Sequence, residues 1–264
     1  MRAVLFVLCW LALPVQAAER VVSLAPSLSE LMLELEAGDL LVGVLDGGER
    51  PPALADKPSV GRYGQLEMER LLRLRPDLIL LWPDSIGPGQ RDQLRQLGIP
   101  LYEAEPHRLA DLADQAAELG ERIGRGKRAR QVTTAFRSRL IALQQRYRRE
   151  RPLTVFYQIW DQPLYTVGGR QIISDALRVC GAENVFADLQ QPAPQISVEA
   201  VLARNPQVIL ASEAKLIDGW KAWPQLDAVR HGQVWAVPDR GLERPSLQML
   251  EATARLCELL EQAR

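Results

Sequence analysis

The side chains that could do chemistry in this 264-residue chain favour binding over catalysis. There are only two histidines, His107 and His231, and the sequence has no Gly-x-Ser-x-Gly, His-Glu-x-x-His or phosphate-loop motif. Large aromatic residues, Trp82 and Trp160 among them, instead follow strand-like runs. Such rings suit a broad, flat, partly apolar ligand through stacking and area burial. We therefore expect a binding protein without catalysis, a metal site or a resident cofactor.

Two glutamates, Glu69 and Glu199, provide a second signal because each opens the same pattern 130 residues apart. The two segments read ERLLRLRPDLIL and EAVLARNPQVIL. In each, a short predicted helix ends at Pro76 or Pro206, because the residue before a proline avoids the helical region. The apolar run that follows is typical of a buried parallel strand. The preserved spacing indicates that one structural unit is duplicated, with an equivalent carboxylate in each half.

Strand and helix patterns alternate around both copies. This alternation predicts an α/β fold of two Rossmann-like lobes with mostly parallel sheets, residues 18–125 and 151–264. Ser29 and Ser174 are the expected N-caps of the first helix in each half. The expected strands span 20–24, 41–44, 78–81, 99–102, 154–158, 184–186, 208–210 and 233–237, and the expected helices span 29–38, 89–97, 174–181 and 219–228.

Between the lobes, residues 126–150 are predicted to form a single long connecting helix. Residues 127–149 contain neither glycine nor proline, and their apolar residues step by three or four positions along one helical face. A helix of that length is a stiff rod of about 35 Å. We expect it to span both lobes and to restrict lobe closure to a small amplitude. The residues of the apolar face are Val132, Phe136, Leu140, Leu143 and Tyr147.

Composition and the N-terminus exclude other classes. The chain has 32 Lys and Arg against 33 Asp and Glu, which leaves no electrostatic footprint for nucleic acid. At the N-terminus, Arg2 precedes an apolar stretch over 3–13, and Val15-Gln16-Ala17 fits a signal-peptidase site. The stretch is shorter than the roughly 20 residues of a membrane span. Residues 1–17 are thus predicted to be a cleaved signal peptide, and the mature protein is expected to have no membrane insertion.

Cleavage would remove Cys9 and leave Cys180 and Cys257 as the mature thiols. Exported proteins mature in an oxidising compartment, so these two cysteines are candidates for a disulfide. The bond would close a 77-residue loop and stabilise the fold by roughly 4 kcal/mol in the chain-entropy model. The alternative is a pair of buried free thiols.

Several runs of residues resemble a known family. The segments RVVSLAPSLSEL, VGV with Pro51-Pro52 after it, and GQLEMERLLRLRPDLIL resemble the first lobe of the helical-backbone (class III) substrate-binding proteins of ABC transporters. The segments VCGAENVF, QISVEAVLARNPQVIL and DRGLERPS are similar to the cobalamin-binding branch of that family. The resemblance implies a monomeric periplasmic protein that carries cobalamin or another corrinoid to an inner-membrane ABC permease dimer with its ATPase subunits. It also implies that Glu69 and Glu199 dock onto that permease.

The resemblance further implies a set of ligand-binding residues on the loops between the lobes. The chain departs from the family pattern at Gly47, Tyr63 and Ala193, where larger aromatic residues are usual. The implied set is Pro26, Gly47, Tyr63, Trp82, Trp160, Asp239, Arg240, Gly241, Leu242 and Glu243.

Two alternatives stay open at this stage. In the first, the same fold binds haem or a ferric siderophore, and arginines around the expected cleft would favour an anionic siderophore. In the second, the chain is an exported α/β enzyme of a chelatase-like kind. The arginines expected around the cleft in the first alternative are Arg50, Arg62, Arg170, Arg240 and Arg244.

Overall fold

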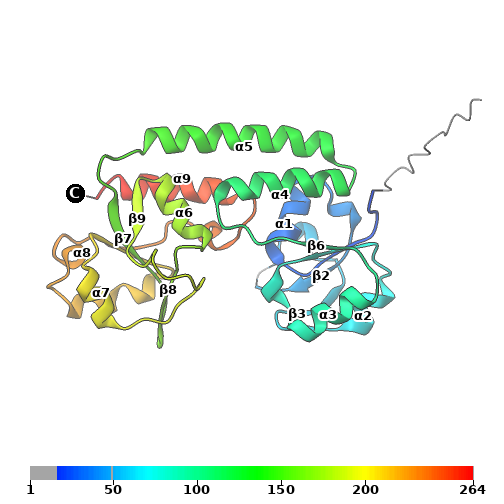
Figure 1. Ribbon diagram of the computed structural model, residues 1–264, viewed down its shortest axis with the longest axis horizontal. Coiled ribbons are helices and arrows are strands. Elements are labelled where there is room, and N and C mark those ends of the chain that lie inside the picture. Colours follow the sequence, from blue (N-terminus) through cyan, green and yellow to red (C-terminus); the bar gives the residue numbers. More distant parts are fainter. Residues whose placement is uncertain (1–16, 49, 264) are drawn as a thin grey trace, which may run out of the picture.

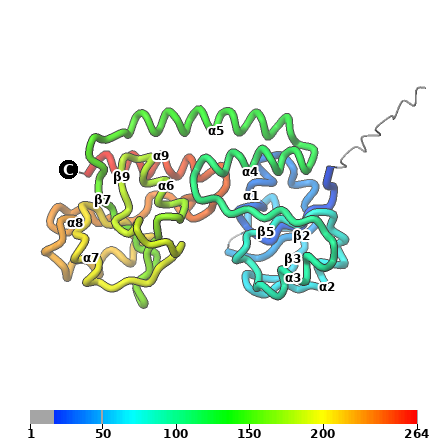
Figure 2. The backbone as a smooth tube through the Cα atoms, viewed as in Figure 1, coloured from blue at the N-terminus to red at the C-terminus, as the bar shows by residue number. Residues whose placement is uncertain are grey.

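The computed structural model describes residues 17–48 and 50–263, which form two α/β lobes beneath a layer of long helices (Figure 1). Figure 2 shows that the chain passes from the first lobe to the second through α5 (Gly126–Arg146), the green segment along one side of both lobes. The predicted signal peptide lies outside the described residues except for Ala17. Within those residues, no helix has the length and apolar character needed to cross a membrane.

The N-lobe is built on a six-stranded sheet with the order β4-β3-β2-β1-β5-β6. Its strands pair in parallel apart from the β3–β4 hairpin. Apolar side chains of α1 and α4 cover one face, and those of α2 and α3 cover the other. The elements are β1 (Val21–Ser23), α1 (Pro26–Glu34), β2 (Leu41–Asp46), β3 (Ser59–Arg62), β4 (Gln65–Leu66), α2 (Met68–Arg73), β5 (Leu78–Leu81), α3 (Pro88–Gln96) and β6 (Leu101–Glu103), with short 3-10 turns at Gly38–Leu40, Pro52–Leu54 and Pro83–Ser85.

The C-lobe contains a five-stranded sheet in which β11, β10, β7 and β8 follow one another and β9 also pairs with β7. The β7–β8 pair is antiparallel and the other pairs are parallel. Helices α6 and α9 cover one face, while α7, η5 and α8 cover the other. The elements are β7 (Leu153–Asp161), β8 (Leu164–Thr166), α6 (Ile172–Val179), β9 (Ala182–Asn184), α7 (Val198–Arg204), β10 (Val208–Ala211), η4 (Ala214–Leu216), η5 (Asp218–Ala222), α8 (Asp227–Arg230), β11 (Val234–Ala236), η6 (Arg240–Glu243) and α9 (Met249–Leu260).

The predicted connecting helix α5 is joined by a second helix, α4, that also packs in the cores of both lobes. The connecting helix α5 ends at Arg146, earlier than the predicted residue 150. Its Phe136 and Leu140 are buried in the C-lobe core, whereas Ala129 packs in the N-lobe core. Helix α4 (Leu109–Arg122) behaves in the same way: its first residue belongs to the C-lobe core and Leu119 to the N-lobe core. The connection between the lobes is therefore a packed helix pair.

Ion pairs accompany this packing, because α5 contains several arginines and no acidic residue. Arg137 lies 2.7 Å from Asp114 of α4, and Arg139 pairs with Glu251 of α9. These side chains are half exposed, and such surface pairs contribute only about 0–1 kcal/mol each. The apolar contacts of α5 consequently supply most of its attachment to both lobes.

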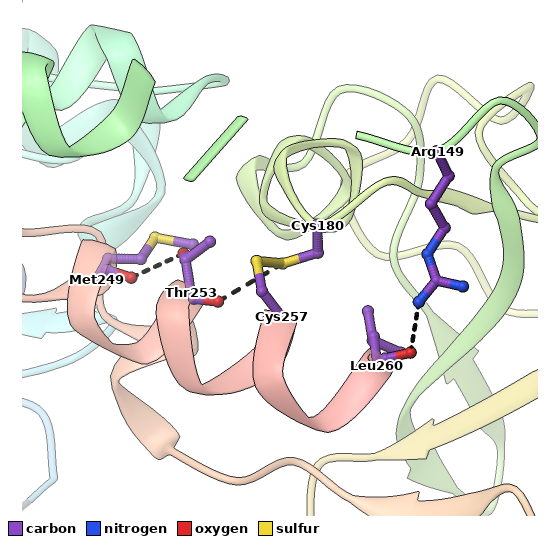
Figure 3. The surroundings of a disulfide bond; sticks show 6 residues. All are labelled: Arg149, Cys180, Met249, Thr253, Cys257 and Leu260. Atoms are coloured by element: carbon purple, nitrogen blue, oxygen red, sulfur yellow. Dashed lines mark hydrogen bonds between the residues drawn. A yellow bond between two sulfur atoms is a disulfide. The ribbon is translucent and has the colours of Figure 1, made fainter. Parts of the chain in front are cut away.

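Cys180 and Cys257 form the expected disulfide, with their Cα atoms 4.7 Å apart (Figure 3). The bond joins the end of α6 to the middle of α9, and both cysteines are fully buried. Arg149, which follows α5, donates a 2.7 Å hydrogen bond to the backbone carbonyl of Leu260, the last residue of α9. The last helix is thus fastened covalently to its own lobe, and the alternative of two free thiols is wrong.

The two expected N-caps were placed wrongly. Helix α1 begins at Pro26, whose fixed φ and missing N–H suit the first helical position, so Ser29 lies inside the helix. Helix α6 begins at Ile172, and the side chain of Gln171 caps it by accepting a hydrogen bond from Ile173. Ser174 is buried and donates its hydroxyl to the carbonyl of Gly168 at 2.8 Å.

The segment 219–228 was also predicted wrongly as one helix. It consists of the end of η5, a turn and the start of α8, because Pro224 interrupts the run and cannot donate a helical hydrogen bond. Strands β3, β4 and β8 were not predicted from the sequence. Each of these strands has only two to four residues.

Candidate functional site

The loops at the carboxyl ends of the parallel strands carry most of the predicted ligand residues. Ligands of open α/β sheets bind at this edge, because the loops there converge and leave a crevice. In the N-lobe, Pro26, Gly47, Tyr63 and Trp82 come within three residues of the ends of β1, β2, β3 and β5. In the C-lobe, Trp160 lies near the end of β7 and Asp239 follows β11.

The loops of the two lobes meet at an inter-lobe cavity of about 370 Å³. The N-lobe contributes α1 and the loop after β2, and the C-lobe contributes the segment after η6. None of the predicted ligand residues lines this cavity, whereas Pro26 and Gly47 line a smaller pocket on the N-lobe. Its lining includes Glu30, Glu34, Arg50, Pro51, Arg244 and Gln248.

Tyr63 and Trp82 form an aromatic pair on the N-lobe. Their ring centroids are 6.1 Å apart with an interplanar angle of 36°, and both rings are exposed. The β3–β4 hairpin presents Tyr63, and its tight approach requires Gly61, where a Cβ would lie 2.2 Å from the carbonyl oxygen of Gln65. The two rings therefore offer a partly preformed apolar surface to a ligand.

Pro26 and Gly47 are also brought into contact. A Cβ at Gly47 would lie 2.8 Å from the ring of Pro26, so a tyrosine at this position would displace the proline. Beside them, Arg50 pairs with Asp46, whose pKa is lowered first by the hydroxyl of Ser59 and then by Arg50. Gly47 and the neighbouring ion pair of Arg50 with Asp46 thus stand where the family pattern has a large aromatic side chain.

On the C-lobe, Trp160 is the exposed aromatic residue. Lys215 Nζ lies 5.3 Å from the centre of its ring, a cation–π arrangement that orients the indole. Trp220, in contrast, is buried, and its Nε1 donates a 2.7 Å hydrogen bond to Oε1 of Gln158. Trp160 is therefore available to a ligand, whereas Trp220 supports the lobe.

The predicted ligand turn Asp239–Glu243 is anchored within the C-lobe. Asp239 accepts hydrogen bonds from the backbone N–H of Gly241 at 2.8 Å and from Arg255 of α9 at 2.9 Å. Leu242 has no exposed surface and packs in the C-lobe core. The side chains of Arg240 and Glu243 remain exposed. Burial nevertheless raises the pKa of the Glu243 carboxyl group, which interacts with the buried hydroxyl of Tyr157, while Leu242 fixes the turn.

Sequence reasoning missed Glu30 and Glu34 of α1, which contact the C-lobe through residues 244–248. Burial raises the pKa of both carboxyl groups, although their hydrogen bonds oppose the shift. A signal was present in the sequence. The two acids are spaced by four on a predicted helix, so they share one helical face.

The two duplicated glutamates lie at equivalent places on the surface. Glu69 is in the first turn of α2 and Glu199 is in the first turn of α7, and both are exposed. The pKa of Glu199 is lowered by its own backbone N–H and by the Ser197 hydroxyl. Neither carboxylate takes part in an ion pair within the described part of the chain. Both are thus accessible to a partner.

Across residues 17–48 and 50–263, no group of three or more His, Cys, Asp or Glu side chains is arranged to hold a metal ion. The site instead combines exposed rings, backbone turns and a few charged groups. This composition fits the recognition of a large ligand by stacking with polar contacts at its rim.

Comparison with known proteins places this geometry in a family. The family model described as periplasmic binding protein matches residues 21–240. The vitamin B12-binding protein of Vibrio cholerae is 35% identical over 247 residues, 92% of this chain and 90% of that protein. The vitamin B12-binding protein of Yersinia pseudotuberculosis is 36% identical over 259 residues, 97% of this chain and 91% of that protein.

A solved structure agrees with these relatives. The crystal structure of the periplasmic vitamin B12 binding protein BtuF of Vibrio cholerae matches with a TM-score of 0.86 and 35% identity, covering 93% of this chain and 98% of that one. The match extends over both lobes and the helices that join them. The chain belongs to the periplasmic binding protein family.

Proposed function

We propose that this protein is a periplasmic receptor that binds cobalamin, or another corrinoid, between its lobes and delivers it to an inner-membrane ABC importer. Cobalamin has a flat, largely apolar macrocycle with amide groups at its rim. Stacking surfaces on both lobes with a small number of polar groups match that chemistry. The names of the relatives at 35% and 36% identity support the same ligand.

One observation carries the proposal. Six large apolar side chains are exposed in the described part of the chain, and the aromatic ones among them are Tyr63, Trp82 and Trp160. All of them come from loops or strand ends at the carboxyl edges of the sheets. Exposed rings are unfavourable in water, so their concentration at this edge supports a stacking ligand.

The arginines weaken the case for an anionic siderophore. Four of the five arginines expected around the cleft already contact acceptor groups of the protein. They are therefore less available to bind an anionic ligand. Arg50 pairs with Asp46 and Arg244 lies 3.0 Å from Glu30. Arg62 donates to Gln65 at 2.7 Å, and Arg170 to His107 at 3.3 Å.

The route of export and delivery follows from the same proposal. Residues 1–17 act as a cleaved signal peptide, and the mature protein works as a monomer in the periplasm. Glu69 and Glu199 contact arginines of a permease dimer, because equivalent residues on related lobes suit a two-fold partner. The packed pair of α4 and α5 keeps lobe closure small, so most of the affinity comes from a preformed site.

The test is a titration of the mature protein with cyanocobalamin, followed by tryptophan fluorescence and calorimetry. We expect saturable one-to-one binding at micromolar or tighter affinity. Haemin and a ferric hydroxamate are titrated in parallel. Tighter binding of either one than of cyanocobalamin contradicts the proposed ligand while leaving the fold and the family in place.

A further inference from the structure

A second connection between the lobes lies beside the inter-lobe cavity. It joins Glu30 and Glu34 of α1 to residues 244–248, the segment between η6 and α9. Glu34 accepts hydrogen bonds from the backbone N–H groups of Leu247 at 3.0 Å and Gln248 at 2.8 Å. It thereby caps the amino end of α9, although it belongs to the other lobe.

Glu30 completes the connection with side-chain contacts. It accepts hydrogen bonds from Arg244 at 3.0 Å, from the hydroxyl of Ser246 at 3.5 Å and from the side-chain amide of Gln248. Its side chain is only 9% exposed. Leu247, whose backbone N–H contacts Glu34, is partly buried against the apolar cores of both lobes. We call Glu30, Glu34 and residues 244–248 the inter-lobe clamp.

The clamp joins the lobes through two partly buried carboxyl groups. Burial raises the pKa of Glu30 and Glu34, although their hydrogen bonds oppose the shift. Buried charged contacts add little net stability, and in some proteins their directional geometry selects one arrangement of the parts that they join. The geometry that they fix here is the placement of one lobe on the other.

The clamp also lies next to the ligand turn in the chain. Residues 239–243 are held on the C-lobe side by Asp239, which contacts Arg255, and by the buried Leu242. The next residue, Arg244, is held by Glu30 of the N-lobe. The turn is therefore fixed between anchors that belong to different lobes.

We propose that Glu30 and Glu34 are positioning residues that set the separation of the two lobes and hold the turn 239–243 in place at their boundary. The inference rests on the proposed function for its ligand. Without the clamp, the lobes sample several separations and only a fraction of the molecules is competent to bind. The apparent affinity is then the intrinsic affinity multiplied by the fraction of competent molecules.

The test first measures lobe separation without any ligand. Spin labels are attached through Leu97→Cys on the N-lobe and Lys221→Cys on the C-lobe, both exposed positions. The double variant Glu30→Gln with Glu34→Gln is compared with the control Glu118→Gln, which removes an exposed ion pair within α4. We expect a broader distance distribution in the double variant and an unchanged one in the control. An unchanged distribution in the double variant overturns the proposal.

Cyanocobalamin titration of the same proteins supplies the second readout. We expect binding weaker by roughly tenfold in the double variant, mainly through the fraction of competent molecules. Equal affinity despite a broader distribution overturns the positioning role. If the double variant does not fold, Gln248→Ala removes one donor to Glu30 and should give an intermediate broadening. Failure of the unaltered protein to bind cyanocobalamin contradicts the proposed ligand, whereas the distance distribution judges the clamp independently.

Discussion

Arg75 and Asn205 adopt the same left-handed backbone conformation at positions 130 residues apart, with φ of +47° and +40°. Each lies directly before a proline and just after the short helix that begins near Glu69 or Glu199; Asn205 follows α7 directly, and Leu74 separates Arg75 from α2. Non-glycine residues rarely adopt positive φ, so its recurrence at equivalent positions supports duplication more strongly than composition does. The repeat preserves the backbone path that presents each glutamate.

The duplicated glutamates lead to a prediction about transport. The double variant Glu69→Ala with Glu199→Ala should keep its affinity for cyanocobalamin, because both residues lie on helices outside the ligand loops. It should fail to stimulate ATP hydrolysis by the reconstituted importer, since both lobes lose their charged contact. Glu118→Ala, on α4, is the matched control and should stimulate normally. Full stimulation by the double variant would remove the docking role.

The exposed rings lead to a prediction about affinity. Trp82→Ala should weaken cyanocobalamin binding by roughly 10- to 100-fold, as expected when the burial of one large ring against the ligand is lost. Tyr63→Ala should have a smaller effect in the same direction. Ile141→Ala on α5 also removes an exposed apolar side chain, but far from the loops, and should leave the dissociation constant unchanged. Equal constants for Trp82→Ala and the unaltered protein would argue against stacking.

The disulfide leads to a prediction about stability. Replacing Cys180 and Cys257 together by serine opens a 77-residue loop and should lower the free energy of unfolding by about 4 kcal/mol. For a chain of this size the melting temperature should fall by roughly 10 °C. Cyanocobalamin affinity at low temperature should not change, because the bond lies within one lobe. A melting temperature equal to that of the oxidised protein would contradict this account.

The raised pKa values of Glu30 and Glu34 lead to a prediction about pH. A carboxyl group whose pKa is raised by folding binds its proton more tightly in the folded protein. Its contribution to stability is complete below the unfolded pKa, about 4.5, and is lost as the pH rises through the folded pKa.

Thermal unfolding at several pH values checks the sign. Compared with Glu30→Gln combined with Glu34→Gln, the unaltered protein should lose relative stability as the pH rises above 4.5 and through the raised pKa values of the folded protein. Leu97→Ala, which changes no titratable group, provides the baseline for the comparison. A relative stability that rises with pH would show that the contacts outweigh the desolvation of the two carboxylates.

Much of the fold was readable from local patterns. The apolar run Leu78–Leu81 was predicted with the bounds that the structure has, because a fully buried strand must be apolar at every position. The aromatic positions Trp82 and Trp160 could be located because they follow such strands. Errors arose where two local signals compete, as at Pro26 and Ser29, which can each begin a helix.

The sequence alone determined the two α/β lobes, the long helix between them, the cysteine pair and the duplicated glutamates. Each of these depends on periodicity, spacing or composition within a short window. Only the tertiary structure decided that Glu30 meets Arg244 and Gln248, residues more than 200 positions away. Local patterns specify which faces must be buried, but the partner of a buried charge is chosen by how the lobes dock.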